Sequence, residues 1–309
     1  MGLRRCSVSS PVSNRLSSLT SIRIKHVVIT DEIVTGILSH SHDLEKLTLS
    51  RCEGLLHLKI FGPSLKLKHL TILFCSSLTK VEVRAKYLTR LQYCGYSVEF
   101  MHMDVPTLCE VIIRNAHHDS RNALNYAREN LSSDVPQLES LTLSLSPIEE
   151  RKMTGQSAPF ANLKKLMIQT FPGLFWGFIP LLQMSPYLRN FQLHVHRVDE
   201  KKGAVSKKPC NSPYPYLEEI TLSGFIGSPH EREFATYLLK NSPNLKKMTI
   251  FYDFLFYVSE TNCLDRYGEE DVEKLAAKGP CRLNMAEKES GVVEQLNNLQ
   301  YPGIQILFI

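Results

Sequence analysis

Aliphatic residues recur along the chain in the order Leu-x-x-Leu-x-Leu, with Ile, Val, Phe, Met or Tyr at some of these positions. Successive copies begin about 20 to 30 residues apart. The last two aliphatic residues of each copy alternate with other residues, which is the period of a short strand with one buried face. The pattern therefore predicts a series of short strands, whose first leucines are Leu19, Leu44, Leu67, Leu88, Leu108, Leu138, Leu163, Leu188, Leu217 and Leu245.

A repeat of this length cannot bury its own aliphatic face, so the units are expected to stack on one another. One strand and one return segment per repeat indicate an α/β fold of the leucine-rich-repeat solenoid type. We expect a curved parallel sheet on the concave face, with helices or short strands on the convex face.

The return segments differ along the chain. Residues 31–39 and 229–240 place aliphatic and aromatic side chains on one helical face, and Ser228 with Glu231 predicts a capping box at the start of the second helix. Between Leu44 and Leu108 the repeats are shorter, and a second strand-like triplet lies midway in each of them. The sequence therefore predicts helical returns near both ends and strand returns in between.

Composition shifts suggest five parts. Residues 1–18 are polar and read as a flexible tail, residues 19–195 carry leucine-rich repeats, and residues 196–213 form a basic exposed loop. Residues 214–251 contain the last two repeats, and residues 252–309 are expected to cap the open end of the stack.

The chain has 309 residues, of which 43% are hydrophobic and 22% charged, and this composition is typical of a globular protein. A net charge of +5 is only a weak indication of acidic partners, and a nucleic-acid binder is usually more basic. No apolar run is long enough to span a membrane, and the N-terminus lacks the apolar segment of a secretory signal. We therefore expect a cytoplasmic or nuclear protein, or one found in both compartments.

Two groups of residues are predicted to be buried. Cys52 and Cys75 each close a repeat at a core position, and the absence of CxxC spacing among the eight cysteines favours reduced thiols. The aromatic run from Phe171 to Pro180 contains Trp176 and is interpreted as packing between repeats on the convex side.

No catalytic, metal or cofactor site is predicted. The pair His194 and His196 could ligate zinc, but His196 falls at a core-facing position and no third ligand is evident. The sequence also lacks G-x-S-x-G, G-x-x-x-x-G-K and H-E-x-x-H. We therefore expect no enzyme and no cofactor.

The alternation within each strand predicts a binding surface. Residues two, four and six positions after the first leucine should face the concave side. Many of them are basic, which suits an acidic or phosphorylated partner segment, although exposed strand residues are commonly polar or basic for solubility alone. The candidate partner-binding residues are Arg23, Lys25, Lys46, His69, Arg90, Gln92, Arg114, Lys165, Gln169, Gln192, His194, Lys247 and Phe251.

Residues 215–250 combine Pro-Tyr-Leu-Glu-Glu-Ile-Thr-Leu, a Gly-Phe-x-Gly turn, a helix and a second strand beginning at Leu245. In this order they resemble the FBD domain of plant F-box/LRR-repeat proteins, so residues 214–251 are interpreted as FBD-like. The resemblance implies a substrate-recognition part of an SCF-type ubiquitin ligase, acting in ubiquitin-dependent protein degradation. An F-box, which docks on a Skp-type adaptor, has no counterpart in the 18 residues before the first repeat, so the adaptor is expected only if an F-box exists outside this chain.

Two functions of different class remain. The first is a protein-binding module that captures a protein substrate. The alternative is a receptor or co-receptor that binds a small molecule or inositol phosphate in the concave face, without ubiquitin-ligase linkage. Nucleic-acid binding would show a steep salt dependence, which the modest charge does not favour.

Overall fold

The computed structural model describes residues 2–4, 18–62, 64–96, 98–115, 126, 130–144, 158–170, 175–195, 212–251 and 304–308. The chain divides into two compact units, unit 1 from Met1 to Leu163 and unit 2 from Lys164 to Ile309, and each is described by itself. Most of the expected basic loop at residues 196–213 and most of the expected capping segment at residues 252–309 lie outside the described residues.

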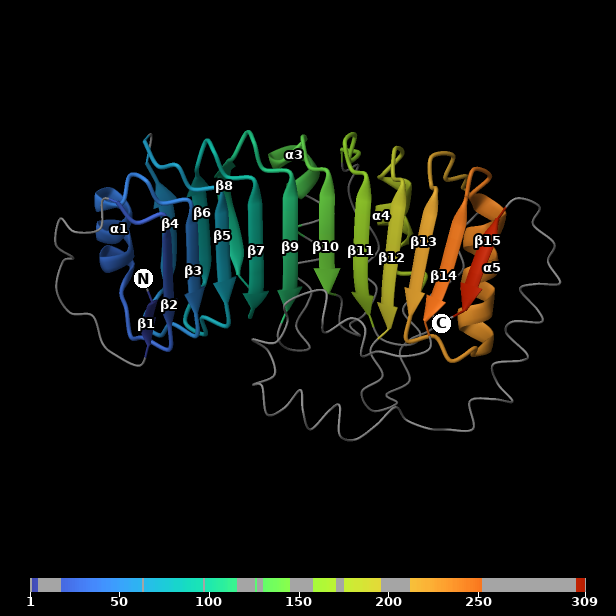
Figure 1. The fold of residues 1–309 in the computed structure, drawn as a ribbon, viewed down its shortest axis with the longest axis horizontal. Coiled ribbons are helices and arrows are strands. Elements are labelled where there is room, and N and C mark those ends of the chain that lie inside the picture. The colour runs from blue at the N-terminus through green and yellow to red at the C-terminus, as the bar shows by residue number, and fades with distance from the viewer. Residues whose placement is uncertain are drawn as a thin grey trace. The chain divides into compact units, whose positions relative to one another are not determined.

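Unit 1 contains a parallel sheet with one strand from each repeat (Figure 1). A further strand lies within the segment expected to be a tail and pairs with the first repeat strand. The strands follow one another in the order β1 (Gly2–Arg4), β2 (Ser21–Lys25), β3 (Lys46–Ser50), β5 (His69–Leu73), β7 (Arg90–Gly95), β9 (Glu110–Asn115) and β10 (Ser140–Ser144).

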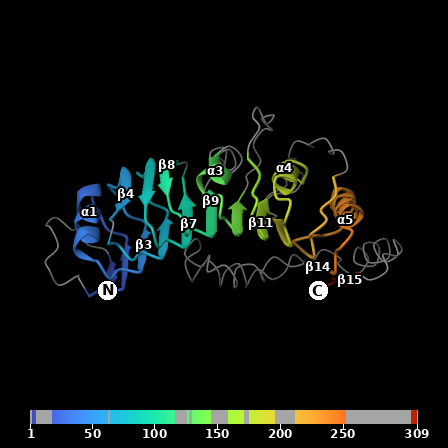
Figure 2. The same ribbon diagram turned by 90° about the horizontal axis from the view of Figure 1, so that it is seen from above.

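The return segments of unit 1 form an outer layer on one side of this sheet (Figure 2). The three predicted strand returns are present and pair in parallel as a second sheet, so this expectation is confirmed. The predicted helix at residues 31–39 is also confirmed. The layer consists of α1 (Asp31–His40), β4 (His57–Phe61), β6 (Lys80–Arg84), β8 (Glu99–Asp104) and α3 (Ser132–Asp134).

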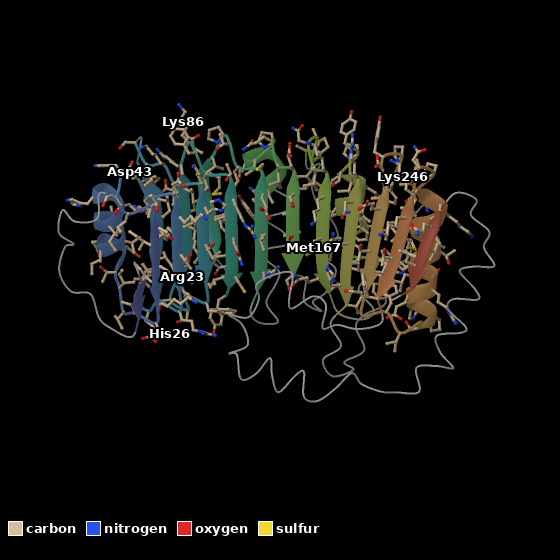
Figure 3. The ribbon with its side chains drawn as sticks, in the orientation of Figure 1. Arg23, His26, Asp43, Lys86, Met167 and Lys246 are labelled. Carbon is tan, nitrogen blue, oxygen red and sulfur yellow. The ribbon has the colours of Figure 1, made fainter. Side chains whose placement is uncertain are left out.

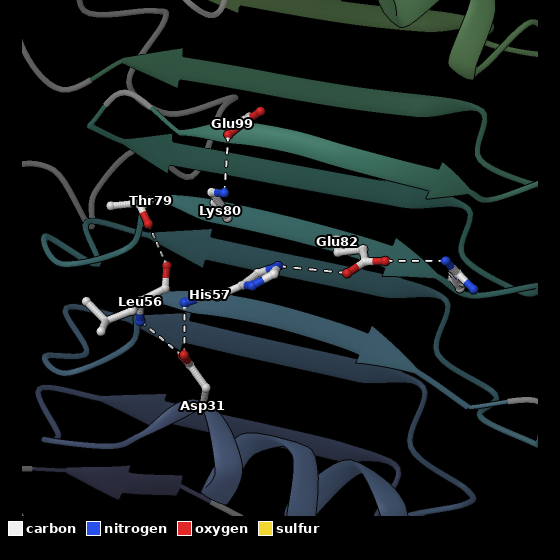
Figure 4. Close-up of polar contacts among 8 residues, drawn as sticks. Asp31, Leu56, His57, Thr79, Lys80, Glu82 and Glu99 are labelled. Atoms are coloured by element: carbon white, nitrogen blue, oxygen red, sulfur yellow. Dashed lines mark hydrogen bonds and ion pairs between the residues drawn. The ribbon is translucent and has the colours of Figure 1, made fainter.

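A polar network joins α1 to the outer sheet (Figure 4). The Asp31 carboxylate, in the first turn of α1, accepts hydrogen bonds from the backbone N–H groups of Leu56 at 3.0 Å and His57 at 2.9 Å. These two N–H groups lie at the start of β4, the strand of the outer sheet that faces α1. On the same sheet, Glu82 pairs with His57 at 3.8 Å and with Arg84 at 3.4 Å. Glu82 therefore has two basic neighbours, and the carboxylate of Asp31 is held by backbone donors.

Unit 2 has the same plan, with its own helices behind a parallel sheet (Figures 1 and 2). The helix predicted at residues 229–240 is confirmed, and its capping box is complete: Glu231 accepts from the Ser228 N–H at 2.8 Å, and Ser228 Oγ accepts from the Glu231 N–H at 3.4 Å. The elements are β11 (Lys165–Thr170), α4 (Ile179–Gln183), β12 (Asn190–Val195), β13 (Glu219–Ser223), α5 (Pro229–Asn241), β14 (Lys247–Phe251) and β15 (Gln305–Phe308).

The core of each unit is built from the repeated aliphatic positions. The second and third aliphatic residues of every copy are at most 3% exposed, which confirms that these strands bury one face. Cys52 and Cys75 are fully buried free thiols, as predicted. Trp176 is 6% exposed and packs on Phe234 and Tyr237 of α5, so the packing role expected for this part of the aromatic run is confirmed. Residues 171–174 of that run lie outside the described residues.

Candidate binding surface

The face of each large sheet that lies away from the helices carries the strand side chains that alternate with the buried ones. We call it the ladder face and define it by the residues two, four and six positions after the first leucine of each repeat. Parallel pairing in register aligns equivalent residues of neighbouring repeats into rows. In unit 1, Lys46 of β3, His69 of β5 and Arg90 of β7 are direct Cα partners in one such row. Arg23 belongs to the next row, where it is the partner of Thr48 (Figure 3).

Five side chains of this face can carry positive charge and lie on four neighbouring strands. We call them the basic cluster: Arg23, Lys25, Lys46, His69 and Arg90. Adjacent strands are only about 4.8 Å apart, so these groups share one region of the surface. The ladder face of β2, β3, β5 and β7 contains no aspartate or glutamate among its described residues. The basic cluster is therefore a region of positive potential.

Neighbouring lysines outside the cluster have acidic partners, whereas two members of the cluster do not. At the turns that precede the strands, Lys66 binds Asp43 at 2.8 Å and Lys68 binds Glu45 at 2.6 Å. Within the part of the chain that the structure describes, Arg23 and Lys46 form no ion pair. Arg90 is 3.5 Å from Glu110, which lies on β9 at the border of the cluster. Arg23 and Lys46 thus remain available to an anionic partner.

The protonation of His69 reflects this environment. Its pKa lies below the ordinary value of 6.5, first because partial burial disfavours the charged imidazolium and then because Lys46 and Arg90 repel it. The carboxylates of Glu110 and Glu45 act in the opposite direction but do not cancel these effects. His69 is consequently neutral at neutral pH and can donate one hydrogen bond and accept another.

The other predicted residues that are accessible divide between the two units. Gln92 of unit 1 is half-buried on β7. In unit 2, Lys165 and Lys247 are exposed, while Gln192 and Phe251 are half-buried. The row that contains Lys165 and Lys247 also contains Asn190 and Glu219, which share a hydrogen bond of 2.8 Å. The ladder face of unit 2 is therefore mixed in charge and has no counterpart of the basic cluster among its described residues.

Three predicted residues are buried, and the expectation that they face solvent is wrong. Arg114 is 4% exposed, Gln169 2% and His194 6%. All three occupy the last ladder-face position of their strand. Equivalent residues in other repeats, such as Ser50 and Ser223, are buried as well.

These buried positions are grouped by the pairing in register. Gln169, His194 and Ser223 are direct partners on adjacent strands of unit 2, and Arg114 is the partner of the buried Cys94 in unit 1. In such a row each side chain is packed against its partners, as His194 shows, because its Nδ1 shares a short hydrogen bond with Ser223 Oγ. The alternation between core and solvent therefore stops before the last ladder-face position of these strands.

Two exposed tyrosines escaped the sequence analysis. Tyr187 is 51% exposed and Tyr216 49% exposed, and each directly precedes the first leucine of its repeat. Their shared Pro-Tyr-Leu sequence is the signal from which they could have been predicted.

In the described part of the chain, no group of three or more His, Cys, Asp or Glu side chains is arranged to hold a metal ion. None of the helices described is both long and apolar enough to cross a bilayer.

Comparison with known proteins places the chain among plant F-box relatives. It is 21% identical over 271 residues to the putative FBD-associated F-box protein At1g61330 and 23% identical over 277 residues to the FBD-associated F-box protein At1g61320, both from Arabidopsis thaliana. Each match covers 80% of this chain and 60% of the relative, so the chain spans about 60% of the length of these curated relatives. The Arabidopsis F-box protein At3g59000 is 29% identical over 136 residues, which are 40% of this chain and 27% of that protein.

A family model describes a larger part of the chain. The model of the LRR domain of At1g61320/AtMIF1 matches residues 1–265, a range that includes every strand of unit 1 and the strands β11 to β14 of unit 2. The resemblance to F-box/LRR proteins with an FBD domain, found from the sequence, is therefore confirmed. This chain belongs to the At1g61320/AtMIF1 LRR-domain family.

Proposed function

We propose that this chain is a protein-binding module whose ladder face captures a partner, with the basic cluster holding an acidic or phosphorylated segment of it. The observation that carries the proposal is the basic cluster itself. It groups five potentially cationic side chains where the ladder face has no carboxylate among its described residues, and it leaves Arg23 and Lys46 without an ion pair there.

The geometry of the cluster suits a chain-like anion. Hydrogen bonds between cationic donors and carboxylate or phosphate oxygens are among the strongest in proteins, and a positive field also accelerates encounter with an acidic partner. A segment that binds Lys46, His69 and Arg90 crosses three adjacent strands, because these residues are direct partners in register. An anion bound beside His69 would also favour its protonated form, which adds a further positive charge.

In this proposal the chain binds without catalysis and uses no cofactor. Its relatives carry the names of F-box and FBD-associated F-box proteins, which supports a role as the substrate-recognition part of an SCF-type ubiquitin ligase. A Skp-type adaptor would then be recruited by an F-box outside this chain. The division into leucine-rich repeats at 19–195, an FBD-like part at 214–251 and a capping segment at 252–309 belongs to the same proposal.

The ladder-face proposal predicts a large effect of charge reversal. The double substitution Arg23→Glu and Lys46→Glu should weaken binding of a fluorescent peptide rich in phosphoserine and glutamate by about tenfold or more, because two favourable charges become repulsive. Fluorescence anisotropy at a fixed ionic strength measures the change. The double substitution Lys59→Glu and Lys80→Glu is the matched control, since both are exposed strand lysines of the outer sheet and the change in net charge is the same. An equal loss in both variants would show that only net charge matters and would remove the ladder face from the proposal.

A second pair of substitutions separates the proposal from its rival, a receptor for an inositol phosphate. Inositol hexakisphosphate should leave the melting temperature of the wild-type chain unchanged if the cluster serves a dispersed peptide. A clear rise that disappears on substitution of Lys46 and Arg90 would favour the small-molecule receptor instead. Arg90 and Lys46 are the suitable pair, because Arg114 is buried and its substitution would also disturb packing.

The ligase linkage has a separate test. Affinity capture from plant extract followed by mass spectrometry should recover a protein substrate with this chain, and the Skp-type adaptor only when the chain is extended by an F-box. Recovery of the adaptor by residues 1–309 alone would contradict this arrangement, and recovery of neither substrate nor adaptor with the extended chain would contradict the ligase role.

A further inference from the structure

Unit 2 presents a row of tight turns just before its strands. In the turn from Ser185 to Leu188, the Leu188 N–H donates to the Ser185 carbonyl at 3.2 Å, and the turn from Tyr214 to Leu217 has the same bond at 3.2 Å. Proline occupies the second position of each turn, where its fixed φ is favourable, and tyrosine occupies the third. The two tyrosines therefore stand at equivalent corners of consecutive repeats.

The rings of Tyr187 and Tyr216 form one exposed aromatic surface. Their centroids are 5.3 Å apart and their planes are inclined by 49°. The Pro186 and Pro215 side chains beside them are exposed too. We call these four residues the tyrosine platform. The two turns are held in register by the backbone that follows them, because the N–H groups of Glu218 and Glu219 both donate to the Arg189 carbonyl.

The fold does not require tyrosine at these corners. At the same corner in three other repeats, the side chain donates a hydrogen bond back to the preceding coil: Thr107 Oγ1 to the Lys86 carbonyl at 2.8 Å, Asn162 Nδ2 to the Pro136 carbonyl at 2.9 Å and Asn244 Nδ2 to the Pro215 carbonyl at 2.7 Å. Neither Tyr187 nor Tyr216 makes such a bond within the described part of the chain. Both phenol hydroxyls thus remain free to donate to a partner.

We propose that the tyrosine platform is a docking site for a proline-rich protein segment in the polyproline II conformation that carries an acidic residue next to its prolines. This surface lies at the turns and not on the ladder face, so the proposal is independent of the function proposed above.

Three properties of the platform select this occupant. Proline rings pack well on exposed aromatic rings, and proline-rich segments are recognised on aromatic-lined surfaces because they are already extended before binding. The polyproline II backbone has no internal hydrogen bonds, so its carbonyl groups need donors, and two phenol hydroxyls can supply them. Arg189 is exposed two residues after Tyr187 and gives the platform a positive neighbour, whereas the nearby Glu218 is already bound to Lys246 at 2.9 Å. An acidic residue beside the prolines is therefore complementary.

The test uses the full chain and a fluorescein-labelled proline-rich peptide that contains one glutamate. The double substitution Tyr187→Ala and Tyr216→Ala should weaken binding by about tenfold or more in fluorescence anisotropy, because aromatic anchors usually dominate such contacts. Tyr87→Ala is the matched control and should leave binding unchanged: Tyr87 is 45% exposed at the same corner of its repeat, but no second ring pairs with it among the described residues.

Two outcomes would overturn the proposal. One is the absence of saturable binding by the wild-type chain, and the other is equal binding of a peptide with the same charge in which every proline is replaced by alanine. If the alanine variant loses its cooperative melting transition, the double substitution Tyr187→Phe and Tyr216→Phe carries the test. This variant keeps the rings and removes both hydroxyl donors, so binding should weaken by about threefold or more, and full retention would contradict the proposed contacts to backbone carbonyls.

Discussion

Replacing Gly224 by alanine should destabilise the folded chain by about 3 to 5 kcal/mol. Gly224 follows β13 with a φ of +74°, a conformation in which an added Cβ is strained. That Cβ would also lie 2.3 Å from the Val195 carbonyl oxygen, which is backbone at the end of β12 and cannot move aside like a flexible side chain. Urea unfolding followed by circular dichroism measures the loss.

Gly36→Ala provides the matched control for Gly224→Ala. Gly36 lies inside α1 with no heavy atom within 4 Å of an added Cβ, so alanine should stabilise the chain by about 1 kcal/mol through its greater helix propensity. The two changes in the free energy of unfolding have opposite signs because Gly224 combines a positive φ with a close backbone neighbour, whereas Gly36 has neither. Equal stability of Gly224→Ala and the wild-type chain would mean that the turn after β13 does not pack against β12 as described.

The repeat register could be predicted from the sequence because each strand places several aliphatic side chains on one face. Leu47 and Leu70, for example, are fully buried partners on adjacent strands, as their places in the pattern require. A shift of one residue in the pairing would expose every such leucine, so an alternative register would be much less stable. The same logic predicts the helix at 229–240, where the capping box and the apolar face agree.

The candidate site could be predicted less completely, because alternation alone does not show which of the outward-facing positions are covered. Arg23, in the middle of β2, and Lys46, at the start of β3, are exposed as the alternation requires. Arg114 and His194, at the last ladder-face position of their strands, are buried beside side chains of the adjacent strands, and nothing in the pattern reveals this. The basic cluster could be recognised only once the order of the strands in the sheet was known. Lys46, His69 and Arg90 are far apart in sequence and become neighbours through the pairing of β3, β5 and β7.

The tyrosine platform escaped prediction for a different reason. Tyr187 and Tyr216 lie in turns, where the core pattern does not constrain the side chain, and their contact depends on the stacking of β12 and β13 in register. The role of a residue in such a turn can be recognised only by comparing it with the residues at the equivalent corners of other repeats. Asn162 and Asn244 show the structural use of that corner, and the tyrosines depart from it.

Phe234 lies at the centre of the aromatic core behind the sheet of unit 2. It is fully buried on α5, and its ring centroid lies 5.4 Å from that of Phe175, 5.4 Å from that of Trp176 and 5.6 Å from that of Phe178. These three partners come from the segment that leads into α4, so Phe234 joins the return segments of two repeats.

Phe234→Ala should therefore lower the free energy of unfolding by about 4 kcal/mol, since three aromatic neighbours cannot collapse easily into the vacated space. Trp176 is the only tryptophan of the chain and lies beside Phe234, so its fluorescence emission should shift to the red as water gains access to the indole. Phe61→Ala is the matched control: Phe61 is 40% exposed on β4, and its removal should cost about 1 kcal/mol or less and leave the emission unchanged. An unshifted emission in Phe234→Ala together with a small change in stability would place Trp176 away from α5 and break the link between the two return segments.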